Sequence, residues 1–266
     1  MRNGWRLAFG TFTVIRVAPP SAVDGRAAGV AMLLAPVTVL PALGVWIMLA
    51  LLVVQGLLPT AVCAVLALSS TALLSRAMHL DGLADTADGF TASYDRDRSL
   101  EVMRRGDTGP AGAAALVLTL LVQAASLASL VQSAVGVALA GTALIASRLA
   151  PAICSRTGIP AARPEGLGHT VAESVQTGRL LTTAAVVVGI GAVGTGLVGS
   201  FQGPVVPAAG AAVAVVLVSC AATVALLRRA VLRFGGITGD VIGAAMEIAL
   251  AASLVAGTVA LRLTTR

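Results

Sequence analysis

The stretch "PAGAAALVLTLLVQAASLASLV" (residues 110–131) carries no charged side chain from end to end. A helix needs about 20 mostly apolar residues to cross the hydrocarbon core of a bilayer, so this stretch predicts a transmembrane helix. Stretches of similar character lie at 28–54, 57–75, 134–150, 180–199, 205–227 and 241–261. The chain is therefore predicted to be all-α, a polytopic membrane helical bundle of about seven transmembrane helices, within a range of six to eight.

The composition supports a single membrane-embedded domain over residues 1–266. Hydrophobic residues make up 57% of the chain and charged residues only 11%, whereas soluble domains average about 25% charged. No polar gap is long enough to fold alone. The N-terminal segment 1–27 has a short apolar stretch interrupted by Arg16, so it is predicted to lie at the membrane interface rather than to act as a signal peptide.

Charge in the gaps between the spans predicts the orientation. The gaps near 55–60, 131–136 and 199–206 are uncharged, whereas the N-terminus and the gaps 76–109, 151–179 and 228–240 hold arginines. The two kinds alternate, so the arginine-bearing segments share one side, which the positive-inside rule makes cytoplasmic. We expect a multi-pass protein of the cytoplasmic membrane with the lipid bilayer as a partner, and a homo-oligomer is left open. Scattered arginines without aromatic neighbours do not favour nucleic acid.

Within the gap 76–109, the stretch "HLDGLADTADG" (79–89) contains three aspartates: Asp81, Asp85 and Asp88. If the helix that begins near Gly56 continues through residue 88, they occupy one face at i, i+4 and i+7. Neighbouring carboxylates about 6 Å apart repel by roughly 3 kcal/mol at an effective dielectric near 20. A divalent cation removes this conflict, and oxygen ligands suit Mg²⁺ or Mn²⁺. The alternative is a solvated helix end beside the membrane.

Small residues beside these acids predict a substrate that approaches closely. Gly82 leaves room for a bulky ligand, and Mg²⁺ held by carboxylates usually shares its shell with substrate phosphates, which indicates phosphoryl transfer. His79 either bonds a phosphate or orients Asp81, although a lone histidine is more often structural.

A second acidic stretch, "GGITGDVIGAAMEI" (235–248), begins the last span. Asp240 and Glu247 are seven residues apart and share a helical face. Thr238 and the glycines lead into a helix N-terminus, where free N–H groups bind phosphate oxygens; an ordinary capped helix start is the alternative. Glu247 lies about two turns inside the span, where an ionised carboxylate needs a partner. Arg148, at the end of another span, needs one too.

These motifs resemble one family. "HLDGLADTADG" (79–89), "GGITGDVIGAAMEI" (235–248), "SR" (147–148) and "EGLG" (165–168) are similar to the adenosylcobinamide-GDP ribazoletransferase, or cobalamin synthase, family, in order and spacing over nearly the whole chain. The resemblance implies that adenosylcobinamide-GDP and α-ribazole, or its 5′-phosphate, are joined with Mg²⁺ to give adenosylcobalamin or its phosphate. GMP is released.

The resemblance also implies residue roles. Asp81, Asp85 and Asp88 take the metal-site positions and, with Asp107, form the predicted catalytic set, in which Asp107 or Asp88 accepts the proton of the attacking hydroxyl. The predicted substrate-binding set is His79, Gly82, Arg104, Arg105, Arg148, Gly168, Thr238, Asp240 and Glu247. One block departs: many members read M-[KR]-D-S-R-x-G-x-x-G where this chain has "MRRGDTGPAG" (103–112), so the expected acid at Arg105 stands at Asp107 instead.

Two other functions remain as rivals. "DGLA" (81–84) is similar to the D-G-x-x-A pattern of CDP-alcohol phosphotransferases, a reading that predicts CMP release. A cation-coupled transporter would use Asp240 and Glu247 as an intramembrane path, but it requires acids spread through the depth of the bilayer. Most acids of this chain gather on one side.

Overall fold

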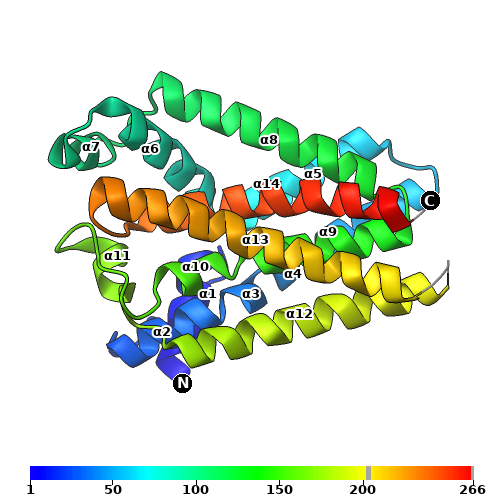
Figure 1. Cartoon of the computed structure of the whole chain (residues 1–266), viewed down its shortest axis with the longest axis horizontal. Coiled ribbons are helices and arrows are strands. Elements are labelled where there is room, and N and C mark those ends of the chain that lie inside the picture. The colour runs from blue at the N-terminus through cyan, green and yellow to red at the C-terminus, as the bar shows by residue number, and fades with distance from the viewer. Residues whose placement is uncertain (202–204, 265–266) are drawn as a thin grey trace.

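The computed structural model describes residues 1–201 and 205–264, and this part of the chain is helical without a named strand (Figure 1). The predicted uncharged turn at 199–206 includes residues 202–204, which lie outside the described ranges. The helices run in the order α1 (Arg2–Phe12), α2 (Gly25–Leu33), α3 (Ala35–Thr38), α4 (Leu40–Val54), α5 (Thr60–Leu74), α6 (Met78–Ala92), α7 (Arg96–Val102), α8 (Pro110–Leu130), α9 (Ala134–Ser147), α10 (Ala150–Cys154), α11 (Gly166–Val171), α12 (Thr177–Ser200), α13 (Val205–Phe234) and α14 (Gly239–Thr264).

The predicted all-α polytopic bundle is confirmed, with a span count at or just below the lower end of the expected range. Among the described residues, five helical segments are long and apolar enough to cross a membrane: Pro110–Leu130, Ala134–Cys154, Thr177–Ser200, Val206–Phe234 and Gly239–Leu263. The bent pair α5–α6 raises the total to six if it counts as one broken span. The number is therefore five or six, of which six lies within the expected range of six to eight and five is one below it.

The predicted first span, 28–54, is wrong as a continuous helix. The chain there forms α2, α3 and α4, and Pro36 and Pro41 each lie in the first turn of a new helix. Proline lacks an N–H and clashes with the preceding turn, so it starts a helix well and interrupts one. The two prolines therefore divide this segment into separate helices, and they leave α4 with 15 residues.

The expected continuation of one helix from Gly56 through residue 88 is also wrong. Arg76 (φ 57°) and Ala77 (φ 55°) adopt the left-handed conformation, and α5 and α6 meet there at 90°. The Arg76 guanidinium donates a hydrogen bond to the Gly10 carbonyl at 2.9 Å, which ties the bend to α1. The three aspartates nevertheless lie on one uninterrupted helix, α6, so their predicted spacing is kept.

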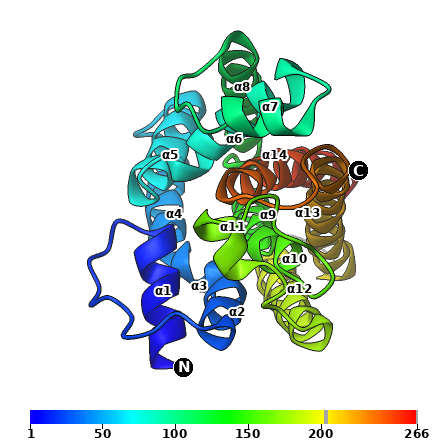
Figure 2. The same ribbon diagram turned by 90° about the vertical axis from the view of Figure 1, so that its left-hand side faces the viewer.

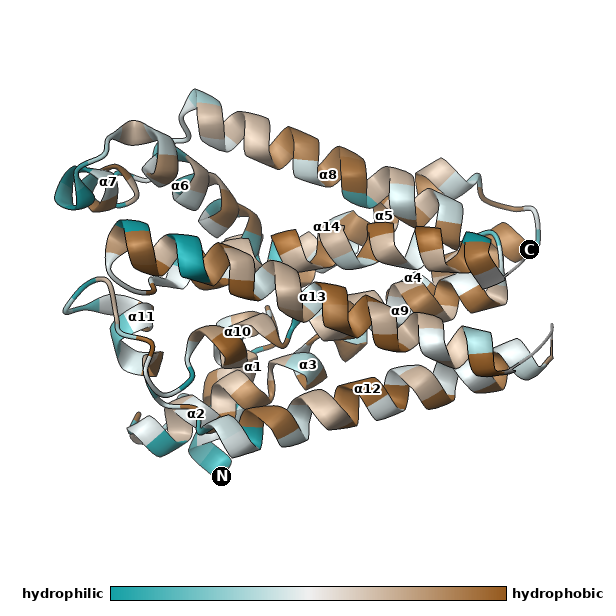
Figure 3. Ribbon diagram, in the orientation of Figure 1, coloured by the Kyte–Doolittle hydropathy of each residue, from teal (hydrophilic) through white to brown (hydrophobic). Residues whose placement is uncertain are grey.

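The arginine-rich segments gather at one end of the bundle, called here the arginine-bearing end. Figure 1 places the N-terminus, α7, α11 and the α13–α14 turn at this end, and the turns before α5 and between α8 and α9 at the other. Hydrophilic ribbon is concentrated there as well (Figure 3). Seen from this end, the long helices recede from the viewer while α1 lies across them (Figure 2).

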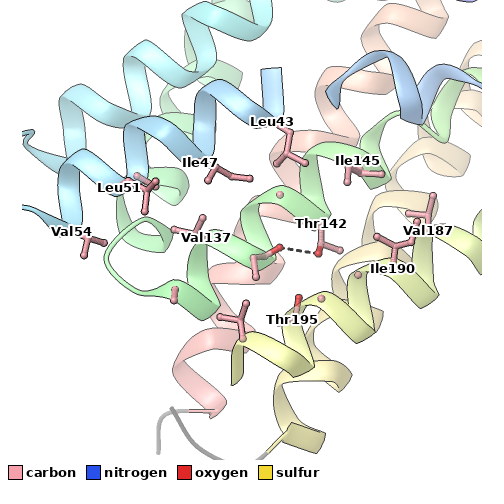
Figure 4. Close-up of a pocket in the computed structure, with 17 residues that line it drawn as sticks. Leu43, Ile47, Leu51, Val54, Val137, Thr142, Ile145, Val187, Ile190 and Thr195 are labelled. Carbon is pink, nitrogen blue, oxygen red and sulfur yellow. Dashed lines mark hydrogen bonds between the residues drawn. The ribbon is translucent and has the colours of Figure 1, made fainter. Parts of the chain in front are cut away.

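A lateral groove of about 420 Å³ separates α4 from α12 and exposes part of α9 (Figure 4). Its walls are aliphatic, including Leu43, Ile47 and Leu51 of α4 and Ile190 of α12. Thr142 of α9 lies in the groove but donates its hydroxyl to the Ala138 carbonyl at 2.9 Å. The groove surface is thus apolar, as expected of a face turned toward lipid.

Substitution of Trp46 by Phe should loosen the contact between α4 and α5. The buried Trp46 indole donates to the Ala67 carbonyl at 2.7 Å and to Thr71 Oγ1 at 3.0 Å. Losing these bonds should cost about 1 kcal/mol and lower the thermal midpoint in detergent by about 2–4 °C. Trp5→Phe is the control, because that ring is 42% exposed. An equal midpoint for both variants would contradict the expectation.

Candidate active site at the crossing of α6 and α14

The two acidic motifs meet where α6 crosses α14. A Cβ on Gly82 would lie 2.7 Å from the Asp240 carbonyl oxygen and 2.9 Å from the Asp240 Cα. One turn along, a Cβ on Gly243 would lie 3.1 Å from the Cα of His79. The contact at Gly82 leaves no space for a side chain and the contact at Gly243 is tight, so the glycines allow the two backbones to touch. The crossing brings the aspartates of α6 beside the start of α14.

An excess of negative charge results at this place. The buried Asp85 carboxylate interacts electrostatically with Asp81, Asp240 and Asp88, and with the single opposite charge of Arg163. Asp240 in turn interacts with Asp81 and Arg163. Asp81 is exposed and Asp240 is partly exposed, so the cluster opens to the surface at the arginine-bearing end. Among the described residues, no three His, Cys, Asp or Glu side chains converge closely enough to form a ready-made metal cluster.

The loop between α10 and α12 covers one side of the cluster. A Cβ on Gly168 would lie 2.6 Å from the Ile237 carbonyl oxygen and 2.8 Å from the Thr238 Cα, so α11 packs against the approach to α14. The Thr238 hydroxyl donates to Asp240 Oδ2 at 3.1 Å and accepts from the Val241 N–H at 3.2 Å. Thr238 therefore caps α14 and orients Asp240 at the same time.

The structure makes Arg163 a functional candidate, although the sequence did not distinguish it from the neighbouring arginines. Its Nη2 donates to the Leu100 carbonyl at 2.7 Å, and its Nη1 lies 4.0 Å from Asp240 Oδ2. Burial lowers the pKa of the Arg163 guanidinium, and the Asp240 carboxylate opposes that shift. The sequence signal was its position two residues before "EGLG", which gave no indication that the loop folds back onto Asp240.

Asp88 is oriented toward the start of α8. Its Oδ2 accepts from the Gly109 N–H at 2.7 Å, and its Oδ1 accepts from the Gly112 N–H at 2.8 Å. The first turn of a helix has free N–H groups and a positive dipole end, so a carboxylate there is stabilising. A Cβ on Gly112 would lie 2.3 Å from Asp88 Oδ2, which explains the glycine. Asp88 thus fastens α6 to α8 beside the other acids.

The segment 103–109 lies at the rim and is exposed at Arg104, Arg105 and Asp107. Arg105 Nη2 donates to Glu101 Oε1 at 2.9 Å, and this hydrogen bond lowers the pKa of Glu101. Arg104 is close enough to Arg163 for their charges to interact. Of the two predicted arginines, Arg104 is therefore the one that shares the charge environment of the acidic cluster.

Three predicted substrate-binding residues lie deeper, in a buried network. Glu247 Oε1 lies 3.7 Å from Arg148 Nη1 and 3.8 Å from His79 Nδ1, and all three side chains are buried. Gln123 of α8, which the sequence analysis missed, donates to Glu247 Oε2 at 3.0 Å and to the Glu247 carbonyl at 3.1 Å. The feature of the sequence that could have identified Gln123 was a lone amide side chain within an apolar span. The network gives Glu247 and Arg148 the charged partner that each was expected to need, at ion-pair rather than hydrogen-bond distance.

Substitution of Gly82 by Ala should separate α6 from α14. The added methyl group would meet backbone atoms of Asp240, which cannot rotate away, and overpacking of this kind costs about 1–3 kcal/mol. We expect a lower melting midpoint in detergent. In the control, Gly44→Ala, the added Cβ meets no described atom within 4 Å, so the midpoint should not fall. A Gly82→Ala protein as stable as the control would refute the tight crossing.

Substitution of Glu247 by Gln should destabilise the bundle strongly. It leaves Arg148, which is 1% exposed, without its carboxylate partner. Removing one member of a buried ion pair typically costs about 3–5 kcal/mol. The readout is again the melting midpoint, with exposed Glu165→Gln as the matched control. Equal midpoints would mean that the network contributes little to stability.

Comparisons with known proteins place the chain in a family. The family model for cobalamin-5-phosphate synthase matches residues 4–258. A relative from Nocardioides sp., named adenosylcobinamide-GDP ribazoletransferase, is 44% identical over 96% of this chain and 98% of its own length. A relative of the same name from Frankia casuarinae is 37% identical over 94% of this chain and 92% of its own length. No solved structure matches significantly. The chain therefore belongs to the cobalamin-5-phosphate synthase family.

Proposed function

We propose that this protein joins adenosylcobinamide-GDP to α-ribazole or α-ribazole 5′-phosphate and releases GMP. Family membership and the shared name of the relatives support this reaction. The ribazole hydroxyl oxygen forms a bond to the cobinamide-side phosphorus of the pyrophosphate. The bond from that phosphorus to the bridging oxygen breaks, and the bridging oxygen leaves on GMP. The product is adenosylcobalamin or its 5′-phosphate.

The observation that carries the proposal is the meeting of the two acidic motifs at the α6–α14 crossing. Asp81, Asp85 and Asp240 lie within electrostatic range of one another, with little opposing positive charge. The atoms that would ligate a metal are all hard carboxylate oxygens, the ligand type that Mg²⁺ and Mn²⁺ prefer. These three residues would hold Mg²⁺, and Asp88 would join them, because each of its oxygens keeps a second lone pair beside the amide hydrogen bond. When bound there, Mg²⁺ supplies charge neutralisation for pyrophosphate oxygens.

The surrounding residues divide into substrate contacts and support. Arg163 and Arg104 border the acids and can hold phosphate oxygens, since a guanidinium donates in a fixed fork. Thr238 and Gly168 shape the loop beside them. Arg148, His79 and Glu247 are buried and face one another, so we assign them to positioning α6 and α14 rather than to direct contact.

The proton of the attacking hydroxyl passes to a carboxylate. Asp107 and Asp88 are the two candidates. Both oxygens of Asp88 already accept amide hydrogen bonds, whereas Asp107 is exposed at the rim. We therefore favour Asp107 as the acceptor.

We further propose that the site faces the cytoplasm across the cell membrane. The chain is a multi-pass membrane protein by its apolar helices. Its acidic cluster lies at the arginine-bearing end (Figure 1), which the positive-inside rule assigns to the cytoplasmic side. Nucleotide-activated corrinoid and GMP would then enter and leave from that side.

Asp81→Asn and Asp85→Asn should each abolish GMP release while the protein still inserts and folds. The assay uses purified protein in detergent with adenosylcobinamide-GDP, α-ribazole and a Mg²⁺ titration, and it follows GMP and cobalamin together. We expect losses of at least about 100-fold, since each variant removes a charged oxygen ligand. Asp97→Asn, at an exposed position of α7, is the control and should keep wild-type activity. Full activity in either cluster variant, or GMP release that is independent of Mg²⁺, would remove the metal assignment.

A further inference from the structure

A second polar pocket lies away from the acidic cluster, between α1 and the start of α2. It encloses about 560 Å³, and the side chains that define it are Arg2, Asn3, Arg6, Ser21, Asp24 and Arg26. These residues come from the N-terminal segment that the proposed reaction does not use.

Specific contacts build the walls of this pocket. Asn3 Oδ1 accepts from the Ser21 N–H at 3.3 Å and from the Ser21 hydroxyl at 3.2 Å, which holds the connecting segment against α1. A Cβ on Gly4 would lie 2.4 Å from Val30 Cγ1, so α1 packs closely on α2. The arginines thus project from a fixed frame.

The charge of the pocket is strongly one-sided. Three arginines face one carboxylate, and Oδ1 of that carboxylate, on Asp24, already accepts the Ala27 N–H at 2.6 Å as the cap of α2. Arg2 and Arg6 are four residues apart and therefore share a face of α1. Within the described residues, the buried Nε of Arg6 has no hydrogen-bond partner, and its Nη1 makes one long hydrogen bond, to the Pro19 carbonyl at 3.5 Å. Guanidinium donors without acceptors are suited to phosphate oxygens.

The surroundings of the pocket match the surface of a membrane. Helix α1 lies across the long helices at the arginine-bearing end (Figure 2), as expected of a helix in the plane of the bilayer. Trp5, between the pocket residues on α1, is 42% exposed and contacts Phe9 edge-on, with 6.0 Å between ring centroids. Exposed tryptophans favour the headgroup level, where one side of the ring is apolar and the other polar.

We propose that this pocket binds the phosphate of an anionic phospholipid headgroup. The lipid would seat its phosphate among Arg2, Arg6 and Arg26, and its acyl chains would lie along the apolar side of α1. The site is independent of the proposed reaction. It gives the N-terminal segment a role in holding α1, and through Gly4 also α2, at the membrane surface.

Quenching of Trp5 by brominated lipids tests this site. The protein is reconstituted into vesicles of equal phosphatidylglycerol and phosphatidylcholine, with bromine on the acyl chains of one lipid or the other. Trp46, the second tryptophan, is 4% exposed and is shielded from lipid. We expect the association constant of phosphatidylglycerol to exceed that of phosphatidylcholine by about fivefold or more. This is the factor that one arginine contributes near an anionic surface. Equal quenching by both lipids in the wild-type protein would overturn the proposal.

A matched pair of triple variants separates the pocket from general charge. Arg2→Gln/Arg6→Gln/Arg26→Gln should lower the preference to about onefold. Arg16→Gln/Arg156→Gln/Arg179→Gln removes the same charge from exposed positions outside the pocket and should keep the preference. An equal loss in both triples would overturn the proposal.

Two further experiments address a pocket variant that does not fold and the chemical source of the bound phosphate. If the pocket triple does not fold, Arg2→Gln/Arg26→Gln changes exposed residues only, and it should lose at least half of the preference. A full preference in this double variant would contradict the site. Inorganic phosphate, compared with chloride at equal ionic strength, should not displace the lipid. Selective displacement by phosphate would show a site for soluble phosphate instead.

Discussion

The architecture of the acidic site depends on the absence of two side chains where α6 crosses α14. Gly82 faces the backbone of Asp240, and Gly243 faces the backbone of His79. This contact places motifs that are far apart in the sequence within electrostatic range of each other. Helix α6 is also attached to α8, because Asp88 accepts hydrogen bonds from backbone N–H groups at the start of α8. Helix α6 is thus fixed by backbone contact on one side and by helix capping on the other.

Ionisable groups along α14 form two levels with different charge balance. At the start of the helix, Asp240 meets the α6 acids and one arginine, and negative charge is in excess. Deeper, Glu247 meets Arg148, His79 and Gln123, and the charges nearly balance. An unbalanced cluster at the surface is suited to binding cations, whereas a balanced one in the interior is tolerated because its charges are paired. In the proposed function, this division would separate metal binding from structural support within one helix.

Much of this arrangement could be predicted from the sequence, because helical periodicity sets which side chains share a face. The apolar spans, the common face of Asp81, Asp85 and Asp88, and the need of Glu247 for a partner all follow from it. The bend at Arg76 and Ala77 could not be predicted, since neither residue favours the left-handed conformation. Contacts between helices across the bundle could not be predicted from the sequence either. Arg163 reaches Asp240 only because its loop folds back, and Gln123 reaches Glu247 only because α8 packs beside α14.

Helix α4 has a consequence for the surrounding lipid. Its 15 residues rise about 22 Å at 1.5 Å per residue, which is less than the roughly 30 Å of a typical hydrocarbon core. Hydrophobic mismatch of this size is relieved when the bilayer thins locally or when polar headgroups sink beside the short helix. The bilayer should therefore be thinner beside α4, an apolar helix too short to count among the five or six spans. Pro36 and Pro41, by limiting the length of α4, would thus affect the thickness of the adjacent bilayer as well as the course of the chain.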